Sequence, residues 1–125
     1  MKMQELSKLS KTELAIMEIF WSTEEPLIFK EIMILVNEKL KRDWKKQTVK
    51  TYLSKLERAG LLKVDKRCAR AYFYSPFYTK EEYQQLCVRK LVEESFDNSI
   101  TNFVAAFNGG KKLSEADIEE LKKLI

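Results

Sequence analysis

The sequence has no histidine and only two cysteines, Cys68 and Cys87. Without an imidazole, the chain has no histidine-containing catalytic triad, no histidine-ligated metal site and no histidine pH switch. Two thiols cannot complete a zinc site of four thiolates, and a lone pair in a chain rich in aliphatic residues is typical of reduced cytosolic thiols. We therefore expect no metal or other cofactor, and no enzyme.

Long apolar runs are also missing. Charged residues interrupt every apolar stretch well before the ~20 residues that a membrane-spanning helix needs. The first thirteen residues, MKMQELSKLSKTE, are polar and lack the apolar segment of a secretory signal. We expect a cytoplasmic protein without membrane insertion. At 125 residues the chain is long enough for one compact domain or two small ones.

The net charge of +4 is unevenly distributed along the chain. Residues 1–78 carry a net charge of +6, whereas residues 79–125 carry −2. The stretch from Lys39 to Arg70 holds 12 basic and three acidic side chains, a net charge of +9. Such asymmetry favours a polyanionic partner for the first part of the chain, although a solvated helix face would also carry many lysines.

Capping signatures predict where three helices begin. A Ser or Thr followed three residues later by an acid satisfies the free N–H groups of a first helical turn, as at Ser10, Thr79 and Ser114. Apolar periodicity predicts the others. The expected helices cover about 10–22, 28–41, 46–59, 79–96, 99–107 and 114–125. The fold is therefore expected to be mainly α-helical.

The helix over 46–59 has two faces of opposite character. An apolar stripe with the spacing of one buried helix face consists of Val49, Tyr52, Leu53 and Leu56. The opposite face is polar and contains no acid, because Glu57 lies to the side. Gly60 follows directly and is expected to end the helix.

Two strand-like runs, 61–66 and 70–75, come next and are expected to pair as a small ribbon, with Pro76 ending the second strand. Their connection lacks Gly and Asn, which favours a longer loop over a two-residue turn. Helix, helix, turn, helix and ribbon is the order of a winged helix-turn-helix, whose second turn-linked helix enters the major groove of DNA. Residues 1–76 are thus expected to form a DNA-binding domain.

The expected contacts with double-stranded DNA are the polar face of helix 46–59 and the ribbon. Amides, hydroxyls and guanidinium groups read base edges or bind phosphates, and lysines neutralise phosphates. The predicted contact residues are Lys45, Lys46, Gln47, Thr48, Lys50, Thr51, Ser54, Lys55, Arg58, Lys66, Arg67 and Arg70.

Residues 77–125 are expected to form a three-helix dimerisation domain, because three narrow helices cannot bury their apolar faces alone. The predicted interface residues are Tyr83, Leu86, Leu91, Ile100, Phe103, Val104, Phe107, Ile118, Leu121 and Leu124. Cys87 is expected in a core. Cys68 lies between Arg67 and Arg70, a setting in which a thiol can sense oxidants, but a plain loop thiol is favoured.

A family resemblance supports this interpretation. The run from Trp44 to Gly60 has a Trp, three variable residues, Thr-Val-x-Thr and an aliphatic-rich helix, and it resembles the recognition helix of the penicillinase-repressor family (BlaI/MecI/CopY type). The first helix, with Glu13, Met17 and Trp21, is similar to the first helix of that family. The chain departs from the family in lacking a ribbon glycine and in having Gln47 where relatives often have Lys.

The resemblance implies a homodimeric repressor on a dyad-symmetric operator that controls β-lactam resistance genes. It further implies release by cleavage of the Asn102–Phe103 bond, after a membrane sensor with a metalloprotease domain detects a β-lactam. The copper-responsive branch has Cys-x-Cys pairs near its C-terminus, and this chain has none. The BlaI/MecI branch is therefore favoured.

Other classes of function remain as alternatives. A MarR-like regulator with a small-molecule inducer is the main one, although such proteins have an additional helix before the DNA-binding unit. A winged helix that binds protein is disfavoured by the +9 stretch. A small nuclease is disfavoured because the chain lacks His and a paired Asp/Glu cluster.

Overall fold

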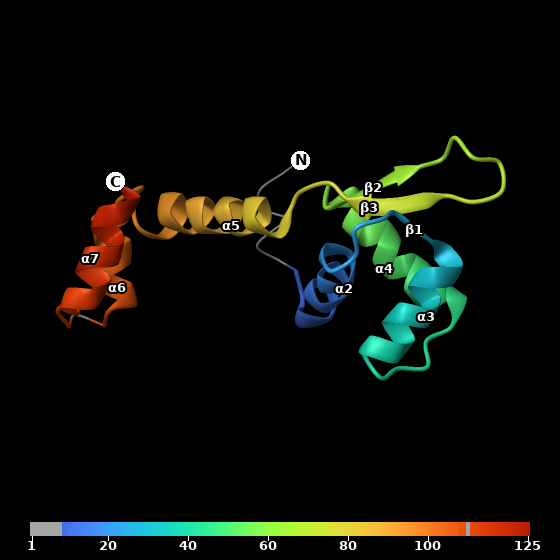
Figure 1. The fold of residues 1–125 in the computed structure, drawn as a ribbon, viewed down its shortest axis with the longest axis horizontal. Helices are drawn as coiled ribbons and strands as arrows, with labels where there is room; N and C mark the ends of the chain where they lie inside the picture. The colour runs from blue at the N-terminus through green and yellow to red at the C-terminus, as the bar shows by residue number, and fades with distance from the viewer. Residues whose placement is uncertain (1–8, 110) are drawn as a thin grey trace. The chain divides into compact units, whose positions relative to one another are not determined.

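The computed structural model describes residues 9–109 and 111–125, so that most of the polar N-terminal stretch lies outside the described residues. Helices and strands follow one another along the chain as Figure 1 shows. They are α2 (Lys11–Trp21), β1 (Leu27–Ile28), α3 (Phe29–Lys39), α4 (Lys46–Arg58), β2 (Leu62–Asp65), β3 (Phe73–Pro76), α5 (Lys80–Ser95), α6 (Ile100–Phe107) and α7 (Glu115–Leu124). The prediction of a mainly helical fold with a small sheet is confirmed.

All three predicted capping sites form. The Ser10 hydroxyl accepts a hydrogen bond from the Glu13 N–H at 3.1 Å, and the Glu13 carboxylate accepts one from the Ser10 N–H at 3.4 Å. At α5, Thr79 and Glu82 make the same reciprocal pair, and at α7 the Ser114 hydroxyl accepts from the first turn. Local side-chain chemistry therefore sets where these helices begin.

The sheet has one strand more than predicted. Residues Leu27 and Ile28 form β1, which pairs antiparallel with β3 and gives the strand order β1-β3-β2. Ile28, predicted as the first residue of a helix, has an extended backbone with φ −88° and ψ 162°, and α3 begins after it. The helical periodicity of the following residues concealed this strand, because two residues are too short to show alternation.

The predicted ribbon is present with shifted ends. Strands β2 and β3 pair in antiparallel register, with Leu62 opposite Pro76 and Asp65 opposite Phe73. Pro76 is thus the last residue of β3, and it does not lie beyond the strand as expected. The connecting loop covers 66–72, longer than the predicted 67–69.

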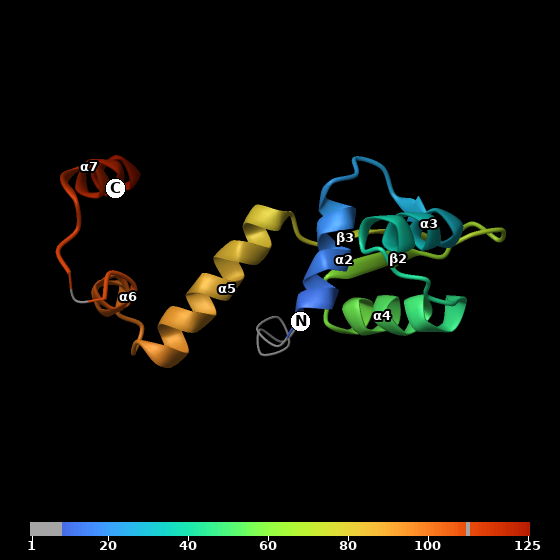
Figure 2. The ribbon, with the colours of Figure 1, turned by 90° about the horizontal axis from the view of Figure 1, so that it is seen from below.

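Contacts divide the chain into two units, Met1–Cys87 and Val88–Ile125, whereas the predicted domain border was residue 76. In the first unit, α2, α3 and α4 lie against the small sheet (Figures 1 and 2), and their apolar faces form the core. Burial of each large side chain contributes roughly 1.5–3 kcal/mol to folding. The most deeply buried residues are Ile16, Met17, Phe20, Ile32, Val36, Val49, Leu53, Leu56 and Leu61.

The start of α5 belongs to this core. Tyr83, predicted in the dimer interface, is buried in the first unit, with its ring centroid 5.3 Å from that of Trp21. Leu86 packs against the same core. Burial and then a hydrogen bond with Cys87 raise the pKa of Tyr83 above its usual value. The capping box at Thr79 starts α5 early enough for Tyr83 to reach Trp21, so that little of the Tyr83 ring is left for a second copy.

The second unit contains the end of α5 with α6 and α7. Its aromatic residues form a row, with centroid separations of 5.6 Å between Phe96 and Phe103 and 6.5 Å between Phe103 and Phe107. Many of its apolar side chains remain exposed, including Leu91, Ile100, Phe107, Leu121 and Leu124. Within the described part of the chain, no helix has the length and apolarity needed to cross a membrane.

Candidate nucleic-acid interface

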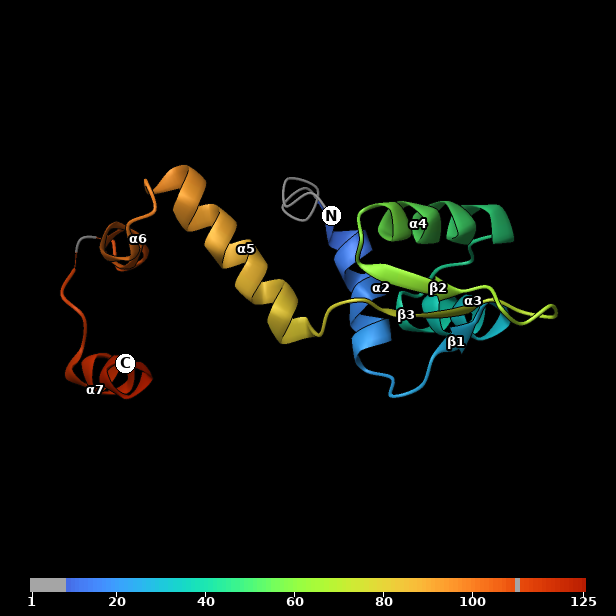
Figure 3. The same cartoon turned by 90° about the horizontal axis from the view of Figure 1, so that it is seen from above.

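Helix α4 separates its core residues from its polar residues as the sequence predicted. Val49, Leu53 and Leu56 are buried, and Tyr52 is half-buried. Figure 3 shows α4 along one side of the first unit. Every predicted contact residue on this helix is exposed, namely Lys46, Gln47, Thr48, Lys50, Thr51, Ser54, Lys55 and Arg58, together with Lys45 just before it. The structure thus presents them on one surface.

No side chain hydrogen-bonds to a backbone N–H at the start of α4. At α3 the N-cap residue Ile28 likewise offers no capping side chain, but its own N–H donates to Glu31. Lys45 occupies the capping position and makes no capping hydrogen bond, and the first turn contains no acid. Each of the other five helices has a side-chain hydrogen bond to a backbone N–H at its start. The free N–H groups and the positive end of the helix dipole at α4 are therefore available to an anion such as phosphate.

A side-chain clamp fixes where α4 begins. The Asn37 amide oxygen accepts a hydrogen bond from the Trp44 N–H at 2.8 Å, and its NH₂ group donates to the Trp44 carbonyl at 3.2 Å. The Trp44 ring stacks on Tyr52 of α4 at 5.0 Å, with the Arg42 guanidinium 5.9 Å from its centroid. Asn37 was missed from the sequence, because nothing local shows that its amide reaches seven residues ahead.

Interactions on α4 reduce the freedom of three predicted contact residues. The Lys55 ammonium lies 3.8 Å from the buried Glu13 carboxylate, and the Lys50 ammonium lies 5.5 Å from the Phe29 ring centroid. The Thr51 hydroxyl donates to the Gln47 carbonyl at 2.9 Å, which leaves it only acceptor capacity.

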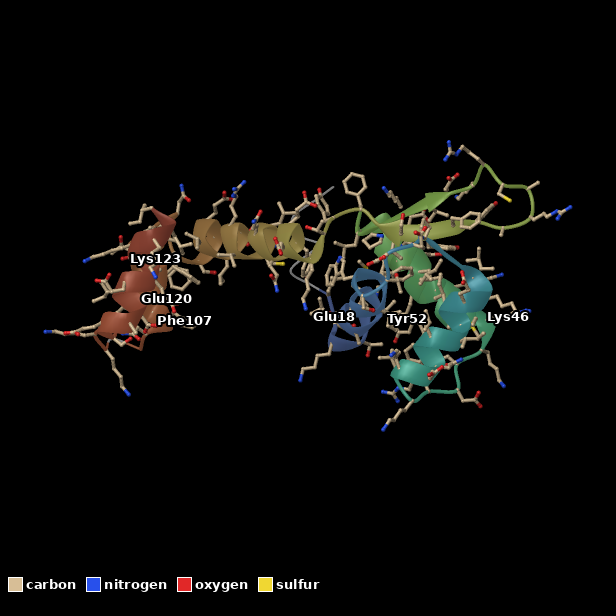
Figure 4. All side chains as sticks on the ribbon, in the orientation of Figure 1. Glu18, Lys46, Tyr52, Phe107, Glu120 and Lys123 are labelled. Carbon is tan, nitrogen blue, oxygen red and sulfur yellow. The ribbon has the colours of Figure 1, made fainter. Side chains whose placement is uncertain are left out.

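Three other cations have no such partner. The side chains of Lys45, Lys46 and Arg58 make no ion pair or hydrogen bond with the residues that the structure describes. Figure 4 labels Lys46 at the start of α4. These cations can therefore meet phosphates without first breaking another contact.

The β2–β3 loop carries the second group of predicted contacts. Lys66, Arg67 and Arg70 are all exposed, and the Lys66 ammonium lies 5.5 Å from the Tyr72 ring centroid. The loop extends beyond the rest of the first unit at the end where α4 begins (Figures 1, 2 and 3). The Arg67 guanidinium, however, forms an ion pair with Asp65 at 2.7 Å. Asp65 was missed from the sequence, although Asp is a recognisable turn residue because its carboxylate can accept from the backbone N–H two residues ahead.

The described residues offer little for metal or redox chemistry. No group of three or more of their Cys, Asp and Glu side chains converges as metal ligands would. Cys68 is an exposed thiol in the loop, and Cys87 is half-buried against the core.

The predicted cleavage bond and the remaining predicted interface residues lie in the second unit. Asn102 is exposed in the first turn of α6, where its N–H donates to the Ser99 hydroxyl at 3.1 Å. Phe103 is half-buried between Phe96 and Phe107. Val104 is half-buried, whereas Leu91, Ile100, Phe107, Ile118, Leu121 and Leu124 are exposed.

Three helices on a small antiparallel sheet with a projecting loop define a winged-helix unit. The chain matches the Penicillinase repressor family over residues 9–125, and it belongs to that family. The family consists of DNA-binding regulators and not of enzymes, which confirms the prediction of a non-enzyme. Transcriptional repression is accordingly its general role.

One solved structure and one curated relative are also similar to this chain. The solved structure described as "Solution structure of the DNA binding domain of the repressor BlaI" matches with a TM-score of 0.52 at 23% identity, over 62% of this chain and 90% of that one. This match confirms the winged-helix fold. A curated relative from Latilactobacillus sakei, "Uncharacterized 16.5 kDa protein in ptsI 3'region", is 26% identical over 95% of this chain and 79% of its own length.

Proposed function

We propose that this protein is a homodimeric transcriptional repressor that places α4 in the major groove of each half of a dyad-symmetric operator. The observation that carries the proposal is the start of α4, where an uncapped helix end and unpaired lysines occur on one exposed surface. The β2–β3 loop would lie over the adjacent backbone. Action on chromosomal DNA requires the cytoplasmic location that the sequence predicts.

The proposed contacts fall into two kinds. Gln47 and Arg58 have side-chain groups that can contact base edges or phosphates, and Thr48 can donate to a phosphate or contact a thymine methyl. Lys45, Lys46, Lys50 and Arg70 would neutralise phosphates and make the affinity depend steeply on salt. Lys55 would act mainly with Glu13 at the α2–α4 contact, because its ammonium lies 3.8 Å from that carboxylate.

Exposed apolar residues of the second unit support homodimerisation. The side chains of Phe107 and Leu124 are 84% and 83% exposed in one copy. A second copy could cover this apolar surface. A hollow lined by Ile100, Val104 and Leu113 adds apolar surface in the same unit. A two-fold dimer joins one patch to itself, and its two α4 helices would read half-sites one helical turn, or a multiple of one, apart.

We further propose that the repressor is released by cleavage between Asn102 and Phe103. Helix α6 has eight residues, which is short enough for local unfolding to cost little, and a protease requires such unfolding. Cleavage would remove Phe103, Phe107 and α7 from the dimer. In this proposal the protease is activated by a membrane sensor that detects a β-lactam, and the repressed genes confer β-lactam resistance.

A mobility-shift titration tests DNA binding. The full chain is mixed with the palindrome upstream of its own gene and with a scrambled duplex of equal length, at several salt concentrations. We expect tighter binding to the palindrome and affinities that fall steeply with salt. Absence of salt-sensitive binding to either duplex would reject the repressor proposal.

A blot of the intact protein in cells exposed to a β-lactam tests release. We expect loss of the full-length band and appearance of a fragment that ends at Asn102. An unchanged band would reject cleavage at this bond and would favour release by a small molecule or another inducer.

A further inference from the structure

The β2–β3 loop contains no glycine, and the Asp65 side chain closes a turn at its start. The Asp65 carboxylate accepts a hydrogen bond from the backbone N–H of Arg67 at 3.0 Å, which closes an Asx-type turn where the chain leaves β2. The turn also brings the Arg67 side chain back over the carboxylate.

Both oxygens of the same carboxylate accept hydrogen bonds from the Arg67 guanidinium. Nε of Arg67 donates to Asp65 Oδ1 at 3.0 Å, and a terminal nitrogen donates to Oδ2 at 2.7 Å. This bidentate geometry is the favoured arrangement of an arginine–carboxylate pair. The Arg67 guanidinium holds the pKa of Asp65 at about 2, so that the carboxylate stays charged throughout the pH range of a cell.

We propose that Asp65 restrains the sequence-independent DNA affinity of this protein by withholding Arg67 from phosphates, so that the loop meets DNA through Lys66 and Arg70. The inference rests on the proposed DNA-binding function. It assigns to Asp65 a positioning and charge-balancing role in which the residue need not touch DNA. Arg67, predicted from the sequence as a contact, would then add no net positive charge to the interface.

The opposite charges of Asp65 and Arg67 should restrain DNA affinity whether or not the Arg67 side chain stays in its ion pair. An exposed ion pair is easily opened, and Arg67 is 90% exposed. If Arg67 turned toward a phosphate, however, it would leave the bare Asp65 carboxylate beside the same backbone. The gain from one phosphate contact would then be offset by repulsion. In both geometries the pair releases no additional counterion.

Asp65→Asn is a suitable test, because the Asn oxygen still accepts the Arg67 N–H and keeps the turn. We would measure affinity for a random-sequence duplex from 50 to 200 mM salt, for the wild type, Asp65→Asn and the double variant Asp65→Asn/Arg67→Gln. One added phosphate contact steepens the salt slope by about 0.9, so that the affinity of Asp65→Asn should fall roughly threefold more over this range. The double variant should return to the wild-type slope.

Two matched controls separate this mechanism from a general charge effect. Glu57→Gln removes an acid beside α4 without freeing an arginine, and it should leave the slope unchanged. Arg70→Gln should make the slope shallower by about 0.9, because it removes a phosphate contact of the loop. Thermal melts of wild type and Asp65→Asn should differ only slightly, since Asn keeps the turn and an exposed ion pair contributes little to stability.

The outcomes are distinguishable. A wild-type slope in Asp65→Asn would overturn the inference, because Arg67 would then already bind phosphate or be out of reach. A steeper slope that persists in the double variant would also overturn it, since Arg67 would not be the source. If the wild-type protein shows no salt-dependent binding to any duplex, the proposed function fails, and this inference fails with it.

Discussion

At the scale of single residues, the structure separates side chains that hold the fold from those available to DNA. Replacing Arg58 by Ala should weaken DNA binding and make the salt slope shallower by about 0.9, because one cation is lost. Its thermal stability should not change, since Arg58 is exposed and makes no ion pair or hydrogen bond with the described residues. Lys50→Ala should have the same effect on binding. It should also lower the free energy of unfolding by ~0.5–1 kcal/mol, because the contact of the Lys50 ammonium with the Phe29 ring is lost.

Leu53→Ala provides the matched control on the same helix. Leu53 is 1% exposed, and its truncation should cost about 2–5 kcal/mol of unfolding free energy. Chemical denaturation and a mobility-shift titration of each variant measure the two effects separately. A large stability loss in Arg58→Ala would show that the division between core and contact face is misplaced.

The ion pair in the loop makes a prediction about pH. Because pairing with Arg67 lowers the pKa of Asp65 from 3.8 to about 2, Arg67→Gln should raise that pKa toward 3.8. The sign follows from linkage: the pair favours the folded state above the unfolded Asp pKa, and this contribution is lost as the pH falls through about 2. A carbon-13 NMR titration of the Asp65 carboxyl group measures its pKa in the wild type and in Arg67→Gln. An identical pKa in both proteins would contradict the pairing.

At the scale of elements, the junction between α3 and α4 depends on one amide. Asn37→Ala leaves the N–H and C=O groups of Trp44 without their partner, and it should cost about 1–3 kcal/mol of unfolding free energy. DNA affinity should fall with it, because the start of α4 loses its anchor. Amide hydrogen exchange of the first turn of α4, measured together with the melting temperature, tests this prediction.

Asn37→Asp is the conservative comparison for the same junction. It retains the acceptor for the Trp44 N–H and loses only the donor to the Trp44 carbonyl. Its stability should therefore lie between those of the wild type and Asn37→Ala. Equal stabilities of all three proteins would mean that the clamp contributes nothing to the position of α4.

Elements with a local signature could be predicted from the sequence, and elements that depend on distant partners could not. Capping boxes at Ser10, Thr79 and Ser114 marked helix starts because their chemistry acts within four residues. Strand β1 escaped prediction because two residues acquire an extended structure only by pairing with β3. The contact of Tyr83 with Trp21 was likewise not predicted, since Trp21 lies more than sixty residues earlier.

In the candidate site, too, locally determined features could be predicted and tertiary contacts could not. Periodicity placed the predicted contact residues of α4 on one exposed face, because helical geometry alone decides which residues share a side. It did not reveal that Lys55 meets Glu13 or that Arg67 meets Asp65, since those contacts depend on tertiary packing and on the conformation of a loop. The sequence thus indicates which residues are presented, and the structure adds which of their charges are already paired.

At the scale of the whole molecule, the apolar surface of the second unit should hold two copies together. Phe107→Glu replaces a side chain that is 84% exposed in one copy by a charged one, so that each copy should still fold. The dimer should dissociate, because the charge would be buried in the interface. Sedimentation velocity over a range of concentrations measures the change. Glu120→Gln, a substitution at another exposed position of this unit, should sediment as the wild type does. A dimer of unchanged affinity in Phe107→Glu would contradict the proposed interface.

In the proposed mechanism dimerisation strengthens operator binding, and a chain shortened to residues 1–102 reproduces the proposed cleavage product. It retains the described core of the first unit, and its thermal transition should therefore persist. On a duplex with one half-site, the shortened and full chains should bind with similar affinity. On the full palindrome, the shortened chain should lose the gain that comes from linking two half-site contacts, and its salt slope should fall to about half, because each bound unit neutralises phosphates in only one half-site. Equal affinity of both chains for the palindrome would show that cleavage at Asn102 cannot release the repressor.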